Sequence, residues 1–184
     1  LRLGRYLRPP PARKLSLKLR SLHPICPMMQ SIETARFGTV RFHDQEVIEF
    51  PAGLPGFEQE HSFLLIEAAE SVPLKFLQSV SSPQLSFVCA PIALVSPSYE
   101  LMLPRQDRDL LAMPPEGAPS GMILEWLAIL CFARPEEPTA NLLGPVAIRR
   151  DVGLGVQSIR EDARYSARQP LFSTTIAEEQ TVCS

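Results

Sequence analysis

The side chains best suited to chemistry lie around two histidines. His43 stands beside Asp44 and Glu46, and His61 follows Glu58 by three positions. Imidazole and carboxylate groups are common metal ligands and general acids or bases. The histidines lack the His-x-x-x-His spacing that places two ligands on one face of a helix. We therefore favour solvated turn residues, and keep a small metal-dependent hydrolase using His43 and His61 as an alternative.

Other catalytic signatures are weak or missing. No serine lies in a Gly-x-Ser-x-Gly elbow, and Gly153-Leu154-Gly155 is only half of a dinucleotide fingerprint. The four cysteines are widely spaced, without a Cys-x-x-Cys pair. Cys89 and Cys131 stand in apolar runs, which predicts small buried side chains and a reducing, cytoplasmic compartment. We predict a protein that is not an enzyme and holds no cofactor or metal.

The most distinctive stretch is Phe50-Pro51-Ala52-Gly53-Leu54-Pro55-Gly56-Phe57-Glu58. Glycine reaches backbone angles that cost other residues energy, and proline fixes one angle. A simple reversal of the chain would not need the aromatic side chains. We expect a rigid turn whose apolar side chains anchor into a core or a partner.

Strands and turns organise the body of the chain. Its nineteen prolines, about a tenth of the residues, disfavour long helices. Turn signals recur about every ten residues, as in all-β barrels and sandwiches. A short helix is expected at 106–113. The predicted strands are 36–42, 47–50, 62–66, 74–80, 85–90, 99–103, 123–133, 142–148 and 156–159.

The charge is divided unevenly between the N-terminal segment and the body. Residues 1–30 hold seven of the eighteen basic residues and no acid, which leaves eleven bases against twenty acids in 31–184, a formal charge of −9. Such a body repels nucleic-acid phosphates and favours basic protein partners, although solubility alone would also explain it. The longest apolar run, 122–133, contains Glu125 and is too short to span a bilayer.

Three segments therefore make up the predicted organisation. Residues 1–30 are a basic extension expected to be disordered, 31–171 are one domain, and 172–184 are a poorly ordered tail. The extension is interpreted as a transit peptide, a nucleic-acid-binding arm, or, as we favour, an upstream extension before a start at Met28 or Met29. An RNA-binding protein using this arm remains a further alternative.

Two amides stand where the pattern is otherwise apolar. Gln78 lies in Phe76-Leu77-Gln78-Ser79, and Asn141 precedes Leu142-Leu143-Gly144-Pro145. Buried amides are usually tied to backbone groups, so a structural role is favoured over partner contact. Tyr165-Ser166-Ala167-Arg168 poses the same choice, and a terminal strand with Tyr165 over the barrel end is its simplest reading.

Several segments together resemble the flagellar assembly factor FliW family. They are 50–58, Phe76–Ser79 with 85–88, 139–148, 155–157 and Tyr165-Ser-Ala-Arg-Gln-Pro-Leu171, and the match covers about residues 31–171. The Gly-Leu-Pro-Gly-Phe-Glu core and the Tyr-Ser-x-Arg-x-Pro-Leu end are specific in combination. The residues singled out as partner-binding or motif positions are Gly53, Pro55, Gly56, Phe57, Glu58, Gln78, Asn141, Tyr165 and Arg168.

The resemblance implies an all-β fold, a small twisted β-barrel-like single domain with short helical turns, and no catalysis. It implies two partners, flagellin and the small basic RNA-binding dimer CsrA. Secreted flagellin would free the protein to bind CsrA and relieve its repression of flagellin translation. We expect a cytoplasmic monomer with no direct contact to nucleic acid or membrane. Lys75, Gly144, Arg149 and Arg150 depart from the expected pattern.

Overall fold

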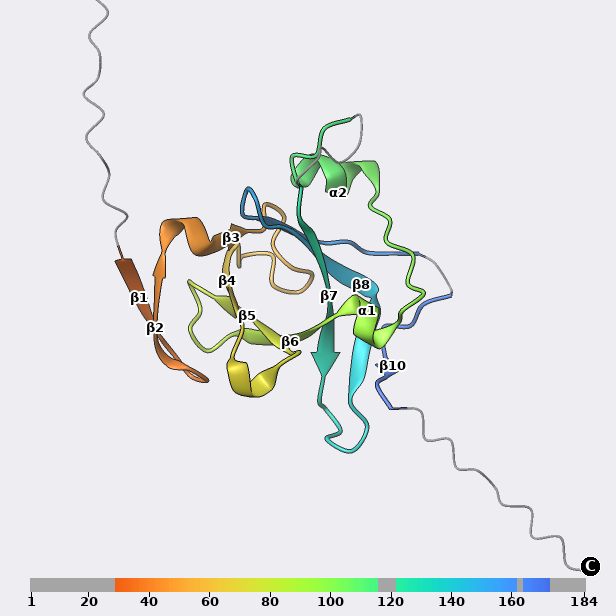
Figure 1. Ribbon diagram of the computed structural model, residues 1–184, viewed down its shortest axis with the longest axis horizontal. Coiled ribbons are helices and arrows are strands. Elements are labelled where there is room, and N and C mark those ends of the chain that lie inside the picture. Colours follow the sequence, from red (N-terminus) through yellow and green to blue (C-terminus); the bar gives the residue numbers. More distant parts are fainter. Residues whose placement is uncertain (1–28, 116–121, 162–163, 173–184) are drawn as a thin grey trace, which may run out of the picture.

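Seven strands close into a barrel in the computed structural model, which describes residues 29–115, 122–161 and 164–172 (Figure 1). The strands are β3 (Val47–Glu49), β4 (Ser62–Ile66), β5 (Lys75–Ser79), β6 (Ser86–Pro91), β7 (Leu124–Cys131), β8 (Thr139–Arg149) and β9 (Leu154–Gln157). Their order is β8-β7-β6-β5-β4-β3-β9, and β9 pairs again with β8. All neighbours are antiparallel except β3 and β9, which are parallel. The predicted all-β barrel is confirmed.

Three short strands and four short helices lie outside the barrel in the described part of the chain. A hairpin of β1 (Met29–Thr34) and β2 (Gly38–His43) lies beside it, and β10 (Gln169–Pro170) pairs with the start of β8 (Figure 1). The helices are α1 (Ile92–Val95), α2 (Arg105–Leu110) and the one-turn η1 (Asp44–Glu46) and η2 (Ala69–Ser71). Within the described part of the chain, no helix is long and apolar enough to cross a bilayer.

Most of the predicted elements occur, with shifted ends. The strands expected at 47–50, 62–66, 74–80, 85–90 and 123–133 correspond to β3 to β7, and the helix expected at 106–113 is α2. The late pair is β8 and β9, but β8 begins at Thr139 rather than Leu142. The hairpin strand expected at 36–42 is Gly38–His43. Alternation of apolar and polar residues therefore located nearly all of the barrel strands.

Four local predictions were wrong or incomplete. Residues 99–103 form no strand: Tyr99 N donates to Ser96 O at 3.0 Å in a turn, and the Tyr99 hydroxyl donates to Leu142 O at 2.8 Å. β1 and α1 were missed, since β1 is polar and largely exposed and α1 has only four residues. Cys131 is exposed at the end of β7, whereas Cys89 is buried as predicted, and burial raises the pKa of its thiol to about 12.

The barrel interior is one apolar cluster that draws on nearly every strand. Phe63, Leu77, Leu127 and Val146 are fully buried there, on β4, β5, β7 and β8. Inward and outward residues alternate along each strand, so the sequence pattern of period two produces this core. Two smaller clusters lie on the outside of the sheet, one under α1 and Tyr99 and one beside α2 around Leu111.

The barrel closes through a close contact between Phe50 and Gly155. Phe50 is fully buried at the end of β3, and an added Cβ on Gly155 of β9 would lie 2.6 and 2.8 Å from two carbons of its ring. Glu49 N donates to Gly153 O at 2.8 Å, beside the parallel pair Glu49 and Leu154. A side chain at 155 would therefore separate the two strands that complete the barrel.

Gly155→Ala should destabilise the fold by about 1–3 kcal/mol, because the rigid Phe50 ring has no space to yield. Urea unfolding followed by Trp126 fluorescence measures the change. Phe50→Leu in the Gly155→Ala background should cost less than in the wild type, since the smaller side chain relieves the clash. Strictly additive effects would contradict this account of closure.

Candidate functional site

The loop between β3 and β4, residues 50–61, is here called the motif loop. Gly53 N donates to Phe50 O at 2.9 Å, and Phe57 N donates to Leu54 O at 2.7 Å, so two tight turns follow one another. The second turn has Pro55 followed by Gly56 at φ +83°. Proline then a positive-φ glycine is the sequence that a type II turn requires. The loop ends are joined by the bond from Phe50 N to His61 O, at 2.7 Å.

Gly53 is required twice over. Its φ is +66°, and an added Cβ would lie 2.7 Å from the Cα of Glu58. Gly56 differs, because nothing lies within 4 Å of a Cβ placed there. The first glycine is needed for its conformation and for close backbone approach, and the second for its conformation alone.

The motif loop buries two of its large apolar side chains and exposes the third. Phe50 and Leu54 are 0% and 1% exposed and belong to the barrel core, whereas Phe57 is 40% exposed. The Phe57 ring meets Phe87 of β6 edge to face, with centroids 5.1 Å apart. The loop is therefore both a folding device that plugs the core and a turn that presents an aromatic ring.

The carboxylate of Glu58 folds back onto the same turn. Gly56 N donates to its Oε1 at 2.8 Å, and this hydrogen bond lowers the pKa of Glu58. Glu58 is exposed and forms no ion pair with any described residue. It therefore carries an uncompensated negative charge beside Phe57.

Glu60 joins the motif loop to the turn after β5, a role that sequence reasoning missed. Ser79 and Ser81 donate to its Oε2 at 2.5 and 2.6 Å, and Ser82 donates to its Oε1. These three hydroxyls lower the pKa of Glu60. The cluster Ser79, Ser81, Ser82 was a visible signal, but its carboxylate partner lies about twenty residues away in sequence.

Gln78 has a structural position. It is fully buried, and its Nε2 contacts the carbonyl oxygens of Ser79, Pro83 and Leu85 at 3.0–3.1 Å. These contacts hold the turn between β5 and β6, as expected for a buried amide.

Asn141 supports a bulge in β8. Leu127 of β7 pairs with Val146 of β8, and Ile129 pairs with Asn141. Between these pairs β7 therefore advances by two residues and β8 by five. Asn141 Oδ1 accepts from Gly144 N at 3.0 Å inside the bulge. The bulge also accommodates Pro145, which cannot donate to a ladder. Asn141 thus stabilises an irregularity of the strand.

Tyr165 packs into the apolar cluster on the outside of the sheet and lies in a bend, so the terminal strand with Tyr165 over the barrel end was wrong. Its ring stacks on Tyr99 at 4.3 Å, and its hydroxyl accepts from Glu100 N at 3.0 Å. Arg168 is exposed near β10, where its backbone N donates to Ser166 Oγ. Both residues belong to the last described segment, 164–172, and not to the motif loop. Their part in partner binding stays a prediction.

The two histidines do not form a metal site. His43 N donates to Glu46 in a local capping arrangement, and His61 Nδ1 lies 3.0 Å from Phe50 O. Among the described residues, no three His, Cys, Asp or Glu side chains are close enough together to hold a metal ion. The basic arm that motivated the RNA-binding alternative falls in 1–28, outside the described residues.

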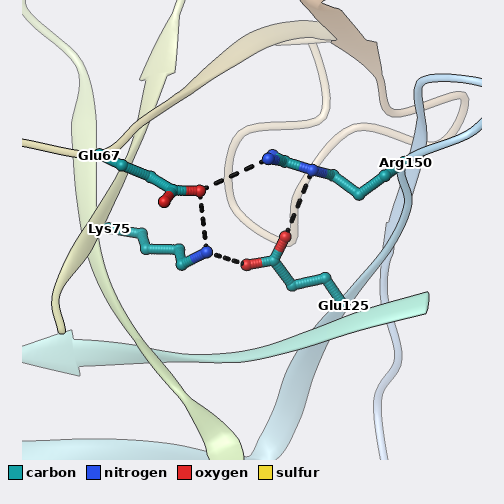
Figure 2. A network of polar contacts seen from close by, with 4 residues as sticks. All are labelled: Glu67, Lys75, Glu125 and Arg150. Carbon is teal, nitrogen blue, oxygen red and sulfur yellow. Dashed lines mark hydrogen bonds and ion pairs between the residues drawn. The ribbon is translucent and has the colours of Figure 1, made fainter. Parts of the chain in front are cut away.

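Four charged side chains form a network at one end of the barrel, and each lies two residues along the chain from a residue of the barrel core or packed against it (Figure 2). Lys75 Nζ lies 2.9 Å from Glu67 and 2.5 Å from Glu125, and Arg150 reaches both carboxylates at 3.4 and 3.5 Å. Burial opposes the charge on Lys75, but the two carboxylates outweigh it and raise its pKa. Lys75 and Arg150, which depart from the family pattern, thus form ion pairs within the fold.

Comparison with known proteins decides the family. The model of the FliW protein family matches residues 31–171. The chain belongs to the FliW family. A flagellar assembly factor FliW of Syntrophomonas wolfei is 35% identical over 150 residues, covering 82% of this chain and 94% of the relative. One from Leptospira interrogans is 33% identical over 151 residues, covering 80% and 96%.

A solved fold of the same family agrees with this barrel. The crystal structure of a flagellar assembly factor FliW matches with a TM-score of 0.72 and 28% identity, over 80% of this chain and 100% of that one. Members of the FliW family are assembly factors rather than enzymes. The non-enzymatic prediction is confirmed on that ground, and the hydrolase alternative is set aside.

Gly53→Ala should destabilise this FliW family member more than Gly56→Ala. A left-handed alanine costs about 1–2 kcal/mol at either site, and only position 53 adds a clash with the Glu58 backbone. Chemical denaturation of both variants measures the difference. Equal losses would show that close approach at Gly53 contributes nothing.

The hydroxyl cluster on Glu60 should make stability depend on acid pH. Because the folded-state pKa is lowered, its contribution is present above the unfolded pKa and is lost as pH falls through the folded pKa. Glu60→Gln should therefore flatten the acid limb of the unfolding free energy, measured by denaturation from neutral pH downward. Glu70→Gln, at an exposed position outside the cluster, is the control. An unchanged acid limb in Glu60→Gln would refute the assignment.

Proposed function

We propose that this protein is a flagellar assembly factor that binds flagellin and CsrA, and that it antagonises CsrA so that flagellin mRNA is translated. The observation that carries the proposal is membership of the FliW family across residues 31–171. The curated relatives named flagellar assembly factor FliW match this chain over 94% and 96% of their own lengths. The partner assignments follow the family resemblance.

The distribution of charge supports a basic partner. Residues 31–184 carry a formal charge of −9, and residues 42–74 contain seven acids but no lysine or arginine. Several bases of the body are already paired, Arg149 with Asp151, and Lys75 and Arg150 with Glu67 and Glu125. Glu49, Glu58 and Glu60 join no ion pair among the described residues. The surplus negative charge of the body attracts a cationic protein and speeds its association.

Binding to CsrA should weaken as salt is added. Raising ionic strength from about 0.01 M to about 0.1 M shortens the Debye length from about 30 to about 10 Å, so attraction between exposed charges is screened. Isothermal titration of the full chain with CsrA at both salt levels measures this, with flagellin as the second ligand. Salt-independent CsrA binding would contradict the electrostatic account. Failure to bind either protein would refute the proposed function.

A further inference from the structure

The turn at 54–57 presents an aromatic ring in an unusually fixed position. Phe57 is 40% exposed, yet its backbone is held by the turn bond to Leu54 O, and its ring is held edge to face by Phe87 at an interplanar angle of 81°. A perpendicular neighbour leaves part of the Phe57 ring accessible. Since the ring is already ordered, a partner that contacts it loses little additional conformational entropy.

Two carboxylates that join no ion pair with a lysine or arginine of the described residues accompany this ring. Glu58 lies over the same turn through its bond to Gly56 N, and Glu60 lies two residues further on among three hydroxyls. Each of these bonds favours the ionised carboxylate. The exposed Phe132, by contrast, lies just after β7, where the charged neighbours Arg134 and Glu137 pair with each other.

An exposed ring beside an exposed, ionised carboxylate matches one kind of side chain best. The guanidinium of arginine stacks on an aromatic face and can also donate two parallel hydrogen bonds to a carboxylate. Lysine offers a more strongly hydrated point charge and no planar stack. We propose that Phe57 and Glu58 form a docking site for an arginine side chain of a protein partner.

The occupant is an arginine on the basic regulator CsrA, so this assignment of the partner rests on the proposed function. Charge complementarity favours CsrA, because Glu58 and the nearby Glu60 join no ion pair among the described residues. An arginine on flagellin and one on a second copy of this chain are the competing occupants. The tests below separate them.

The first test uses the arginine group itself. The full chain is titrated with N-acetyl-arginine amide, and then with N-acetyl-lysine amide, while the ring resonances of Phe57 are followed by NMR. The arginine compound should shift the Phe57 ring, and the lysine compound should shift it less. No movement of the ring, or equal movement with lysine, would overturn the arginine site whether or not CsrA binds.

The second test measures affinity for CsrA. Phe57→Leu removes the π face but keeps an apolar side chain, and Glu58→Gln removes charge but keeps an acceptor for Gly56 N. Each should weaken CsrA binding by about 3- to 30-fold, the range expected for a cation–π contact or a charge-assisted bond. Phe132→Leu and Glu136→Gln, at exposed positions beyond β7, are matched controls that should leave affinity unchanged.

The outcomes separate the site from the function. Wild-type binding to CsrA that survives both Phe57→Leu and Glu58→Gln would overturn the site while leaving the proposed function intact. If the two variants lose flagellin binding alone, the occupant is an arginine of flagellin rather than of CsrA. If they lose a dimer seen by analytical ultracentrifugation, the occupant is a second copy of this chain. Thermal melts of both variants establish that the fold is retained, and Glu58→Gln decides the matter if Phe57→Leu is destabilised.

Discussion

Packing of Phe50 against the bare backbone of Gly155 is the contact on which the barrel depends. Every other junction is an antiparallel ladder with several paired residues, whereas β3 and β9 share a single parallel pair. Such a short junction needs support beyond its hydrogen bonds. The buried ring supplies it, and only glycine leaves space for that ring.

The motif loop begins at this same contact, so closure and surface display are coupled. Phe50 and Leu54 complete the core, and the turn between Leu54 and Phe57 then projects its ring outward. Glu60 attaches the far end of the loop to the turn after β5. The loop therefore cannot change its outer shape without disturbing its buried anchors.

The charged side chains also fall into two groups, those paired within the fold and those without an ion pair. Lys75, Arg149 and Arg150 reduce the negative charge of the sequence, yet Lys75 and Arg150 pair with Glu67 and Glu125 (Figure 2), and Arg149 pairs with Asp151. Lys75, Glu125 and Arg149 are only 19%, 18% and 11% exposed, so these pairs balance charges that the fold partly removes from water. Glu58 and Glu60 of the motif loop, by contrast, join no ion pair among the described residues.

The sequence by itself determined the strand pattern, the acidic body and the special turn at 50–58. Alternation locates the strands because inward and outward positions repeat every two residues, and the Pro-Gly order specifies a type II turn locally. Tertiary structure alone decided which polar groups meet: Glu60 with three serines, and Asn141 with the bulge before Pro145. It also decided that Gly155 must admit a ring from β3. These contacts join segments far apart in the chain or depend on strand register, which local patterns do not encode.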